Sequence, residues 1–159
     1  MSKDSKPKLI QEIGELARVS SLTTELYEET VCEALGVNRT DLHVLDVLER
    51  IGALTAGKLA KETGLSPGAM TAAIDRLEAA GHVRRVRNAA DRRTITVEIT
   101  PATRKRAWEL YGPMKEAHDA ALSRSTLAEL ETIREYWRRA IAAGEGQVAR
   151  LQGEIGSTV

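Results

Sequence analysis

The stretch that decides the fold is TAGKLAKETGLSPGAMTAAIDRLEAAGHVRRVRNAADRRTITVEIT, residues 55–100. Thr55 is a good N-cap for a short helix, and Gly64 suits the left-handed conformation that ends one. Ser66 and Pro67 repeat this start, with a cap followed by proline at the first helical position. Two short helices joined by so tight a turn predict a helix-turn-helix, whose second helix enters the major groove of DNA. An ordinary helical hairpin inside a larger core is the alternative.

A β-hairpin rich in arginine is predicted directly after these helices. Ile95, Val97 and Ile99 alternate with polar residues, which is the period of a half-buried strand. Residues 83–87 are the expected antiparallel partner, and residues 88–91 carry turn-forming side chains. A protruding ribbon of one charge sign suits insertion beside phosphates, with an arginine in a narrow minor groove. The basic residues of the hairpin are Arg84, Arg85, Arg87, Arg92 and Arg93.

This combination resembles the MarR family of bacterial transcriptional regulators, and the length and flanking helices agree over essentially the whole chain. The segments that carry the resemblance are KLAKETGLS (58–66), IDRLEAAG (74–81) and RRVRNAADRRTITVEIT (84–100). Its most specific part is an Asp-x-Arg wing signature followed by a strand that ends in Ile-Thr. The resemblance implies that Arg93 enters the minor groove and that Asp91 orients it by an ion pair. It also implies an obligate homodimer, and a small-molecule or redox signal that changes DNA affinity.

The second helix and the wing supply the residues expected to touch DNA. Early, outward positions of that helix suit base edges, while basic residues suit phosphates. Family members often carry arginine at the position of Ala72, so specificity is expected to depend on Thr71, Arg76, the wing and DNA shape. For Lys58 and Lys61, phosphate contact and plain solvation are both open. The predicted DNA-contacting residues are Ser66, Gly68, Ala69, Thr71, Ala72, Arg76, Arg84, Asp91, Arg92 and Arg93.

Helical periodicity continues on both sides of this unit. Across residues 8–35 apolar side chains recur every three or four positions, and so long a stripe finds little partner in a small winged-helix core. A second subunit is the natural partner, which would hold two recognition helices roughly 34 Å apart on a pseudo-palindromic operator. We therefore expect a mainly α fold with a small β-wing, divided into an N-terminal dimerisation helix (1–36), a winged helix-turn-helix DNA-binding domain (37–100) and C-terminal dimerisation helices (101–159).

The C-terminal part contains two helical patterns with glycine or proline inside them. The Gly-Pro pair at 112–113 predicts a kink or break, because an interior proline costs about 3 kcal/mol. Residues 126–129 fit a capping box that starts the next helix. Gly144 and Gly146 are expected to loosen the end of that helix, although Val148, Leu151 and Ile155 allow a further turn or two.

Composition excludes several classes of protein. The 159 residues suit one domain of ordinary size, and the formal net charge of zero means that attraction to nucleic acid must be local. A single cysteine rules out an intrachain disulfide and fits a reducing cytoplasm. No apolar run approaches the ~20 residues of a membrane span, and no signal peptide opens the chain. We therefore expect a cytoplasmic protein without a membrane partner.

Neither an enzyme nor a metal site is indicated. The sequence contains no glycine-rich phosphate loop, no nucleophile elbow and no paired-histidine helix motif. His43, His82 and His118 form no recognised ligand spacing with Cys32. The sequence thus predicts a non-enzymatic DNA-binding protein with no cofactor, and the family resemblance implies a ligand-responsive transcriptional regulator, interpreted as a repressor.

The signal that controls such a regulator is the least specified feature. The resemblance implies a small aromatic effector, bound between the dimer helices and the winged unit. A redox sensor acting through Cys32 is an alternative, although the nearby Glu28 and Glu29 should raise the pKa of its thiol. A dimeric winged-helix adaptor that has lost DNA binding is another alternative. The side chains expected to reach the effector crevice are Arg18, Tyr27, His43, Trp108 and Tyr111.

Overall fold

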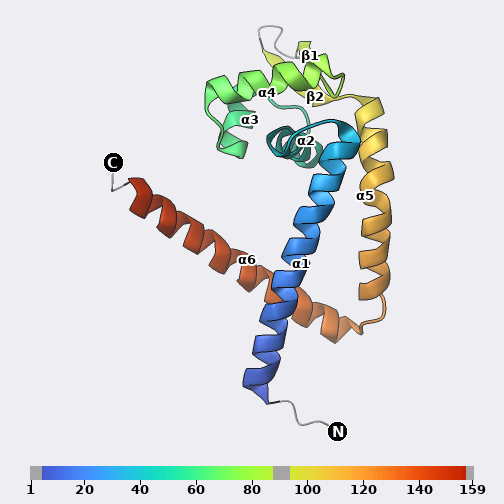
Figure 1. The fold of residues 1–159 in the computed structure, drawn as a ribbon, viewed down its shortest axis with the longest axis vertical. Helices are drawn as coiled ribbons and strands as arrows, with labels where there is room; N and C mark the ends of the chain where they lie inside the picture. Colours follow the sequence, from blue (N-terminus) through green and yellow to red (C-terminus); the bar gives the residue numbers. More distant parts are fainter. Residues whose placement is uncertain (1–4, 88–93, 157–159) are drawn as a thin grey trace. The chain divides into compact units, whose positions relative to one another are not determined.

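The computed structural model describes residues 5–87 and 94–156 and is mainly helical (Figure 1). Its strands form a two-stranded sheet, so the predicted fold class, a mainly α chain with a small β-wing, is confirmed. The elements in chain order are α1 (Lys6–Leu35), α2 (Arg39–Ile51), α3 (Ala56–Thr63), α4 (Pro67–Ala79), β1 (Val83–Arg87), β2 (Ile95–Ile99), α5 (Pro101–Leu122) and α6 (Leu127–Gly156).

The chain divides into two compact units, Met1–Leu110 and Tyr111–Val159. The first unit contains α1 to α4, the two strands and the first part of α5, whereas the second contains the rest of α5 and α6. Among the helices of the described ranges, none combines the length and the apolar character that crossing a membrane requires. The predicted site residues fall mostly in the first unit.

The larger core cluster of the first unit is built from α2, α3, α4 and both strands. A smaller cluster joins α1 to α2 and consists of Val31, Cys32 and Leu42. Each helix turns one apolar stripe inward, as the spacing of its apolar residues predicts. Leu59 of α3 is completely buried, and it packs in the same cluster as Ile74 of α4 and Val97 of β2. The helix-turn-helix and the wing are therefore anchored in a single cluster of side chains.

The predicted helix ends of the helix-turn-helix are confirmed. The side-chain oxygens of Thr55 and Ser66 each accept a hydrogen bond from a backbone N–H three residues later, at 3.3 and 3.2 Å. Gly64 ends α3 with a φ of 70°, a left-handed conformation in which a side chain would be strained. Local hydrogen bonding thus sets where α3 ends and α4 begins.

The wing is the antiparallel hairpin that strand alternation predicts. Its register runs from Val83 opposite Ile99 to Arg87 opposite Ile95. Leu54, just before α3, adds an isolated bridge to Val97 of β2, with hydrogen bonds of 3.1 and 2.7 Å. The base of the wing is therefore attached to the chain that leads into α3, a contact that the sequence did not indicate.

The expected break near Gly112 is wrong, whereas the further helical turns allowed after Gly146 are present. α5 runs unbroken across Gly112 and Pro113, and α6 continues through Gly144 and Gly146. The proline removes one hydrogen bond, while Ala, Leu, Glu, Lys and Met around it favour the helix. Each interior glycine costs only about 1 kcal/mol relative to alanine, which a long helix of good helix formers tolerates.

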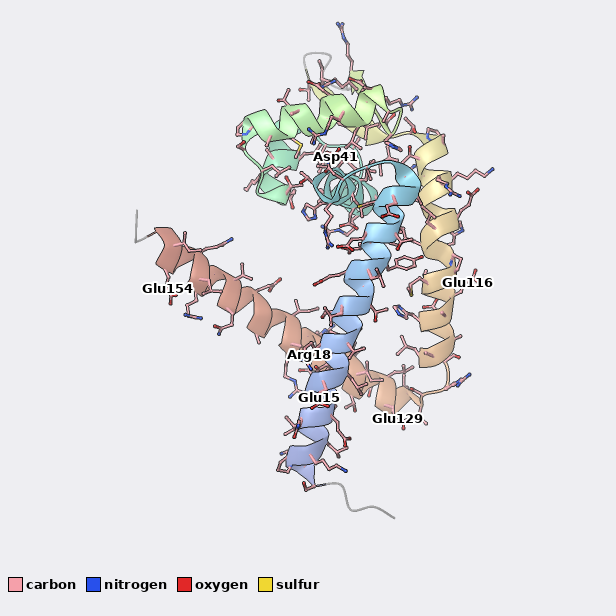
Figure 2. All side chains as sticks on the ribbon, viewed as in Figure 1. Glu15, Arg18, Asp41, Glu116, Glu129 and Glu154 are labelled. Atoms are coloured by element: carbon pink, nitrogen blue, oxygen red, sulfur yellow. The ribbon has the colours of Figure 1, made fainter. Side chains whose placement is uncertain are left out.

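α6 begins with the predicted capping box. The backbone N–H and the hydroxyl of Thr126 both donate to Oε2 of Glu129 at 2.8 Å, near the start of α6 (Figure 2). In return, the N–H of Glu129 donates to Oγ1 of Thr126 at 3.4 Å. The backbone hydrogen bond and then the hydroxyl lower the pKa of Glu129 below its ordinary value.

We expect Glu129→Gln to destabilise the protein at neutral pH and to have a smaller effect in acid. A carboxylate whose pKa is lowered by folding stabilises the native state above its unfolded pKa, and this stabilisation is lost as pH falls through the lowered value. Thermal unfolding followed by circular dichroism between about pH 7 and pH 3 measures the difference from wild type. Glu131→Gln, on the same helix, is the matched control. If the stability difference between Glu129→Gln and wild type did not become smaller in acid, the stabilising role of the Glu129 carboxylate would be contradicted.

Candidate nucleic-acid interface

The outward face of α4 carries the residues predicted to read base edges. Met70, Ala73, Ile74 and Leu77 are buried and point into the core. The periodicity of the helix therefore leaves the opposite face exposed, as expected for a recognition helix. The exposed candidates at the start of this face are Ser66, Gly68, Ala69, Thr71 and Ala72.

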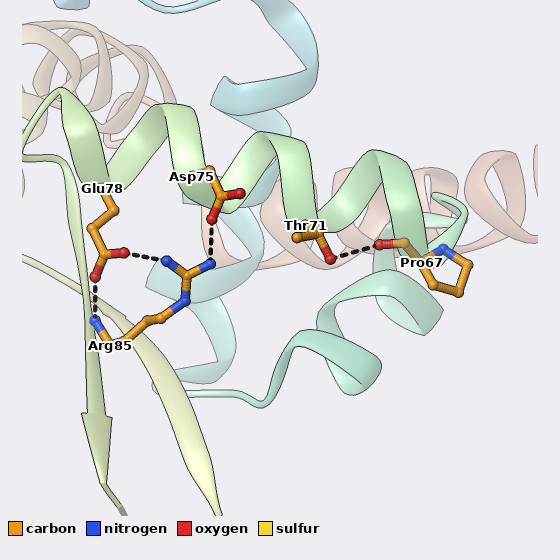
Figure 3. A network of polar contacts seen from close by, with 5 residues as sticks. All are labelled: Pro67, Thr71, Asp75, Glu78 and Arg85. Atoms are coloured by element: carbon orange, nitrogen blue, oxygen red, sulfur yellow. Dashed lines mark hydrogen bonds and ion pairs between the residues drawn. The ribbon is translucent and has the colours of Figure 1, made fainter.

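This face begins with small groups and no long hydrogen-bond donor. Gly68, Ala69 and Ala72 present only backbone, hydrogen atoms and methyl groups. Thr71 donates its hydroxyl hydrogen to the carbonyl of Pro67 at 3.0 Å, within its own helix (Figure 3). The first two turns of α4 therefore differ chemically from a recognition helix that uses arginine or glutamine.

Arg76, the next candidate along α4, is held by Asp41 of α2. Its Nη2 and Nε donate to the two carboxylate oxygens of Asp41 at 2.6 and 3.1 Å. Asp41 is buried, and Asn38 donates a further hydrogen bond to it at 3.1 Å. The hydrogen bond to Asp41 raises the pKa of Arg76. This pair, whose Asp41 is labelled in Figure 2, connects α4 to α2.

Arg85 of β1 joins the wing to the recognition helix. Its Nη2 donates to Asp75 at 2.5 Å, and its Nη1 donates to Glu78 (Figure 3). The backbone N–H of Arg85 donates to Glu78 as well, at 3.1 Å. The pKa of Arg85 is raised, chiefly by the hydrogen bond to Asp75 and further by its pairing with Glu78. Neither carboxylate was a predicted site residue.

Arg84 pairs with a different carboxylate from the two that Arg85 contacts. Successive side chains of a strand point to opposite faces. Nε of Arg84 donates to Glu98 of β2 at 2.6 Å, so this pair lies within the hairpin. The remaining predicted wing contacts, Asp91, Arg92 and Arg93, lie outside the described residues, and their roles stay predictions.

His82 connects the flanking helices to the loop between α4 and β1. Its Nε2 lies 3.0 Å from the carbonyl of Leu35 at the end of α1, and a carbonyl can only accept, so Nε2 donates. Its Nδ1 lies 3.1 Å from the hydroxyl oxygen of Thr103 in α5. Thr100 donates to the carbonyl of Gly81 at 2.9 Å. The ends of α1 and α5 are thus attached beside the recognition helix.

The five predicted effector residues are not assembled into one pocket by the described contacts. The hydroxyl of Tyr27 donates to the carbonyl of Leu110, which places it between α1 and α5. Arg18 of α1, His43 of α2 and Trp108 of α5 are exposed to solvent. Tyr111 belongs to the second unit. The effector crevice therefore stays a prediction.

Cys32 is buried near the end of α1, where a thiolate is disfavoured. Burial is the main cause that raises the pKa of its thiol, and Glu28 and Glu29 raise it further. Arg39 opposes this shift but is paired with both carboxylates, at 2.9 and 3.6 Å. These surroundings favour a structural thiol over a redox sensor.

The described residues also contain no candidate metal centre. Across residues 5–87 and 94–156, no three side chains of histidine, cysteine, aspartate or glutamate are grouped so that they could hold an ion. The chemistry of the interface is therefore that of arginine ion pairs and small exposed groups.

The chain is similar in sequence and in fold to known proteins. A sequence model of the MarR family matches residues 35–94. YcgE of Bacillus subtilis, an uncharacterized HTH-type transcriptional regulator, is 34% identical over 95% of this chain and 98% of its own. The HTH-type transcriptional repressor MdtR of B. subtilis is 35% identical over 43% of this chain and 44% of its own. The structure of an S. aureus MepR mutant bound to an oligodeoxyribonucleotide is 18% identical, with a TM-score of 0.58 over 82% of this chain and 96% of that chain.

Proposed function

This chain belongs to the MarR family of transcriptional regulators and carries its DNA-binding winged helix, and from this premise we propose that it acts as a homodimeric, ligand-responsive repressor. The family and its curated relatives are regulators, so the prediction that the chain is not an enzyme is confirmed. The proposed target is a pseudo-palindromic operator in double-stranded DNA.

The observation that carries the proposal is the exposed face of α4 beside an arginine-rich hairpin. α4 is a helix of 13 residues whose buried side is fully used by the core, which leaves its other side for a major groove. The adjoining hairpin suits the neighbouring minor groove, with Arg93 as the inserted side chain and Asp91 and Arg92 beside it. MepR, which shares the fold, is bound to an oligodeoxyribonucleotide.

Dimerisation is supported by the apolar side chains that α1 leaves exposed. Large exposed apolar surfaces on a helix indicate an interaction site. We propose that a second copy covers them, because an isologous dimer would also provide two recognition helices for two half-sites. The exposed apolar residues of α1 are Leu9, Ile10, Ile13, Leu16, Val19, Leu22 and Leu26.

Repression is proposed because the relative MdtR is named a repressor. A small aromatic molecule is the proposed effector, on the basis of the family resemblance and the aromatic residues Tyr27 and Trp108 of the helices that flank the winged unit. Release of the operator on effector binding would then restore transcription. The proposed place of action is the cytoplasm.

The test of this function begins with selection of duplexes from a random-sequence pool by the wild-type protein. We expect a palindromic consensus and a dimeric mass in sedimentation. The logarithm of affinity should fall with the logarithm of salt concentration with a slope near −0.9 per neutralised phosphate. A dimer that selects no sequence and shows no salt-dependent binding would favour the adaptor instead. A stable monomer at micromolar concentration would contradict the proposed assembly.

The small groups on α4 also predict which base feature is read. Alanine and threonine methyl groups recognise thymine through its C5-methyl group in the major groove. Replacing the half-site thymines by deoxyuridine removes only that methyl, so we expect about a fourfold loss of affinity for each contacted methyl. Fluorescence anisotropy measures it, and deoxyuridine placed outside the footprint is the control. Equal affinity for both duplexes would show that Ala69, Thr71 and Ala72 do not read thymine.

A further inference from the structure

Among the residues that the structure describes, three polar contacts of Arg85 go from the wing to the recognition helix. Its guanidinium bridges Asp75 and Glu78, which lie one turn apart on α4, and its backbone N–H reaches Glu78 too. The Arg85 side chain is 34% exposed and Glu78 is 38% exposed, whereas Asp75 is 60% exposed. We call this group of three residues the wing clamp (Figure 3).

A two-stranded hairpin is marginally stable alone, so its direction depends on what holds its base. The core supplies Val83 and Val97, and the bridge to Leu54 supplies a second attachment. The wing clamp adds a polar attachment to α4 itself. Arginine suits this role because its planar fork can bind two acceptors at once in a fixed geometry.

We infer that Arg85 is a positioning residue, which sets the spacing between recognition helix and wing through Asp75 and Glu78. The inference rests on the proposed function, because the two elements must enter adjacent grooves of one duplex together. Contacts that depend on their relative placement distinguish an operator from other DNA, whereas charge alone supports nonspecific binding. The wing clamp therefore contributes to specificity more than to general affinity.

The competing role for Arg85 is direct contact with a phosphate. In that role, Asp75 and Glu78 would weaken DNA binding twice, by repelling phosphates and by holding the arginine away from them. Removal of these carboxylates would then strengthen binding. The phosphate role thus predicts tighter binding of both duplexes with an unchanged operator-to-scrambled ratio, whereas the positioning role predicts a lower ratio, so the carboxylates are the best place for a test.

The experiment compares wild type, Arg85→Ala, Asp75→Asn/Glu78→Gln and the triple variant. Each is titrated with an operator duplex selected by the wild-type protein and with a scrambled duplex of the same composition, at several salt concentrations. Arg50→Ala is the matched control, because it removes the same charge and breaks an exposed ion pair with Asp46 within α2. Arg85→Lys tests whether a positive charge without the planar guanidinium is enough to maintain the operator-to-scrambled affinity ratio. Circular dichroism verifies that each variant is folded.

We expect Arg85→Ala and Asp75→Asn/Glu78→Gln each to lower the operator-to-scrambled affinity ratio, roughly tenfold in a dimer. The triple variant should lower this ratio no more than Arg85→Ala or Asp75→Asn/Glu78→Gln does, since all three residues act as one unit. The salt slope of Arg85→Ala should equal that of wild type, and Arg85→Lys should recover only part of the ratio. If Arg85→Ala does not fold, the affinity ratios of Asp75→Asn/Glu78→Gln and Arg85→Lys still test the inference.

The inference would be overturned if Asp75→Asn/Glu78→Gln bound both duplexes more tightly with an unchanged operator-to-scrambled ratio. A salt slope of Arg85→Ala reduced by about one for each lost arginine would also overturn it. Full recovery of the ratio by Arg85→Lys would do so as well. A wild-type protein that does not distinguish operator from scrambled DNA would refute the proposed function instead, so the two failures are separable.

Discussion

Leu59→Ala is expected to lower the free energy of unfolding by about 3 kcal/mol, within the range for removing a buried leucine side chain. Leu59 has no exposed surface and lies in the cluster that joins α2, α3, α4 and the wing. The truncation loses buried apolar area and leaves a cavity that close-packed neighbours fill only in part.

Urea denaturation followed by circular dichroism measures this loss, and the thermal midpoint should fall by roughly 6–12 °C. Lys61→Ala is the control, since it changes an exposed side chain of the same helix. A loss below about 1 kcal/mol would show that the cluster around Leu59 collapses to fill the space. The DNA affinity of the folded fraction should remain that of wild type, because Leu59 has no exposed surface.

Arg93→Ala is expected to weaken operator binding roughly 100-fold while the fold stays intact. A single arginine that reads DNA contributes about 1–3 kcal/mol, and a dimer would lose two of them. The residue follows the hairpin turn of the sequence and lies outside the described residues, so the expectation rests on the family resemblance and on the wing to which it belongs.

Fluorescence anisotropy at one fixed salt concentration measures the change, and circular dichroism shows whether the variant is folded. Arg139→Ala in α6 is the control, because it removes one positive charge from an exposed side chain outside the winged unit. An unchanged footprint and an unchanged affinity would mean that the wing tip does not contact the operator.

The local elements were largely predictable from the sequence, because each depends on neighbours a few positions away. Thr55 and Ser66 cap their helices through hydrogen bonds to backbone N–H groups three residues on. Strand alternation predicted that residues 83–87 pair antiparallel with the strand containing Ile95, Val97 and Ile99, as observed. The predicted break near Pro113 is absent for a reason that is also local. One residue that disfavours a helix does not outweigh many neighbouring residues that favour it.

The sequence by itself determined that this chain forms a winged helix-turn-helix and belongs among DNA-binding regulators, because caps, periodicity and turn residues act over one or two helical turns. Only the tertiary structure decided which arginines form ion pairs with carboxylates from other parts of the chain. Arg76 is held by Asp41, 35 residues away, and Arg85 is held by Asp75 and Glu78. Such pairs depend on how helices and strands pack against each other, and residue spacing along the chain does not encode that packing directly.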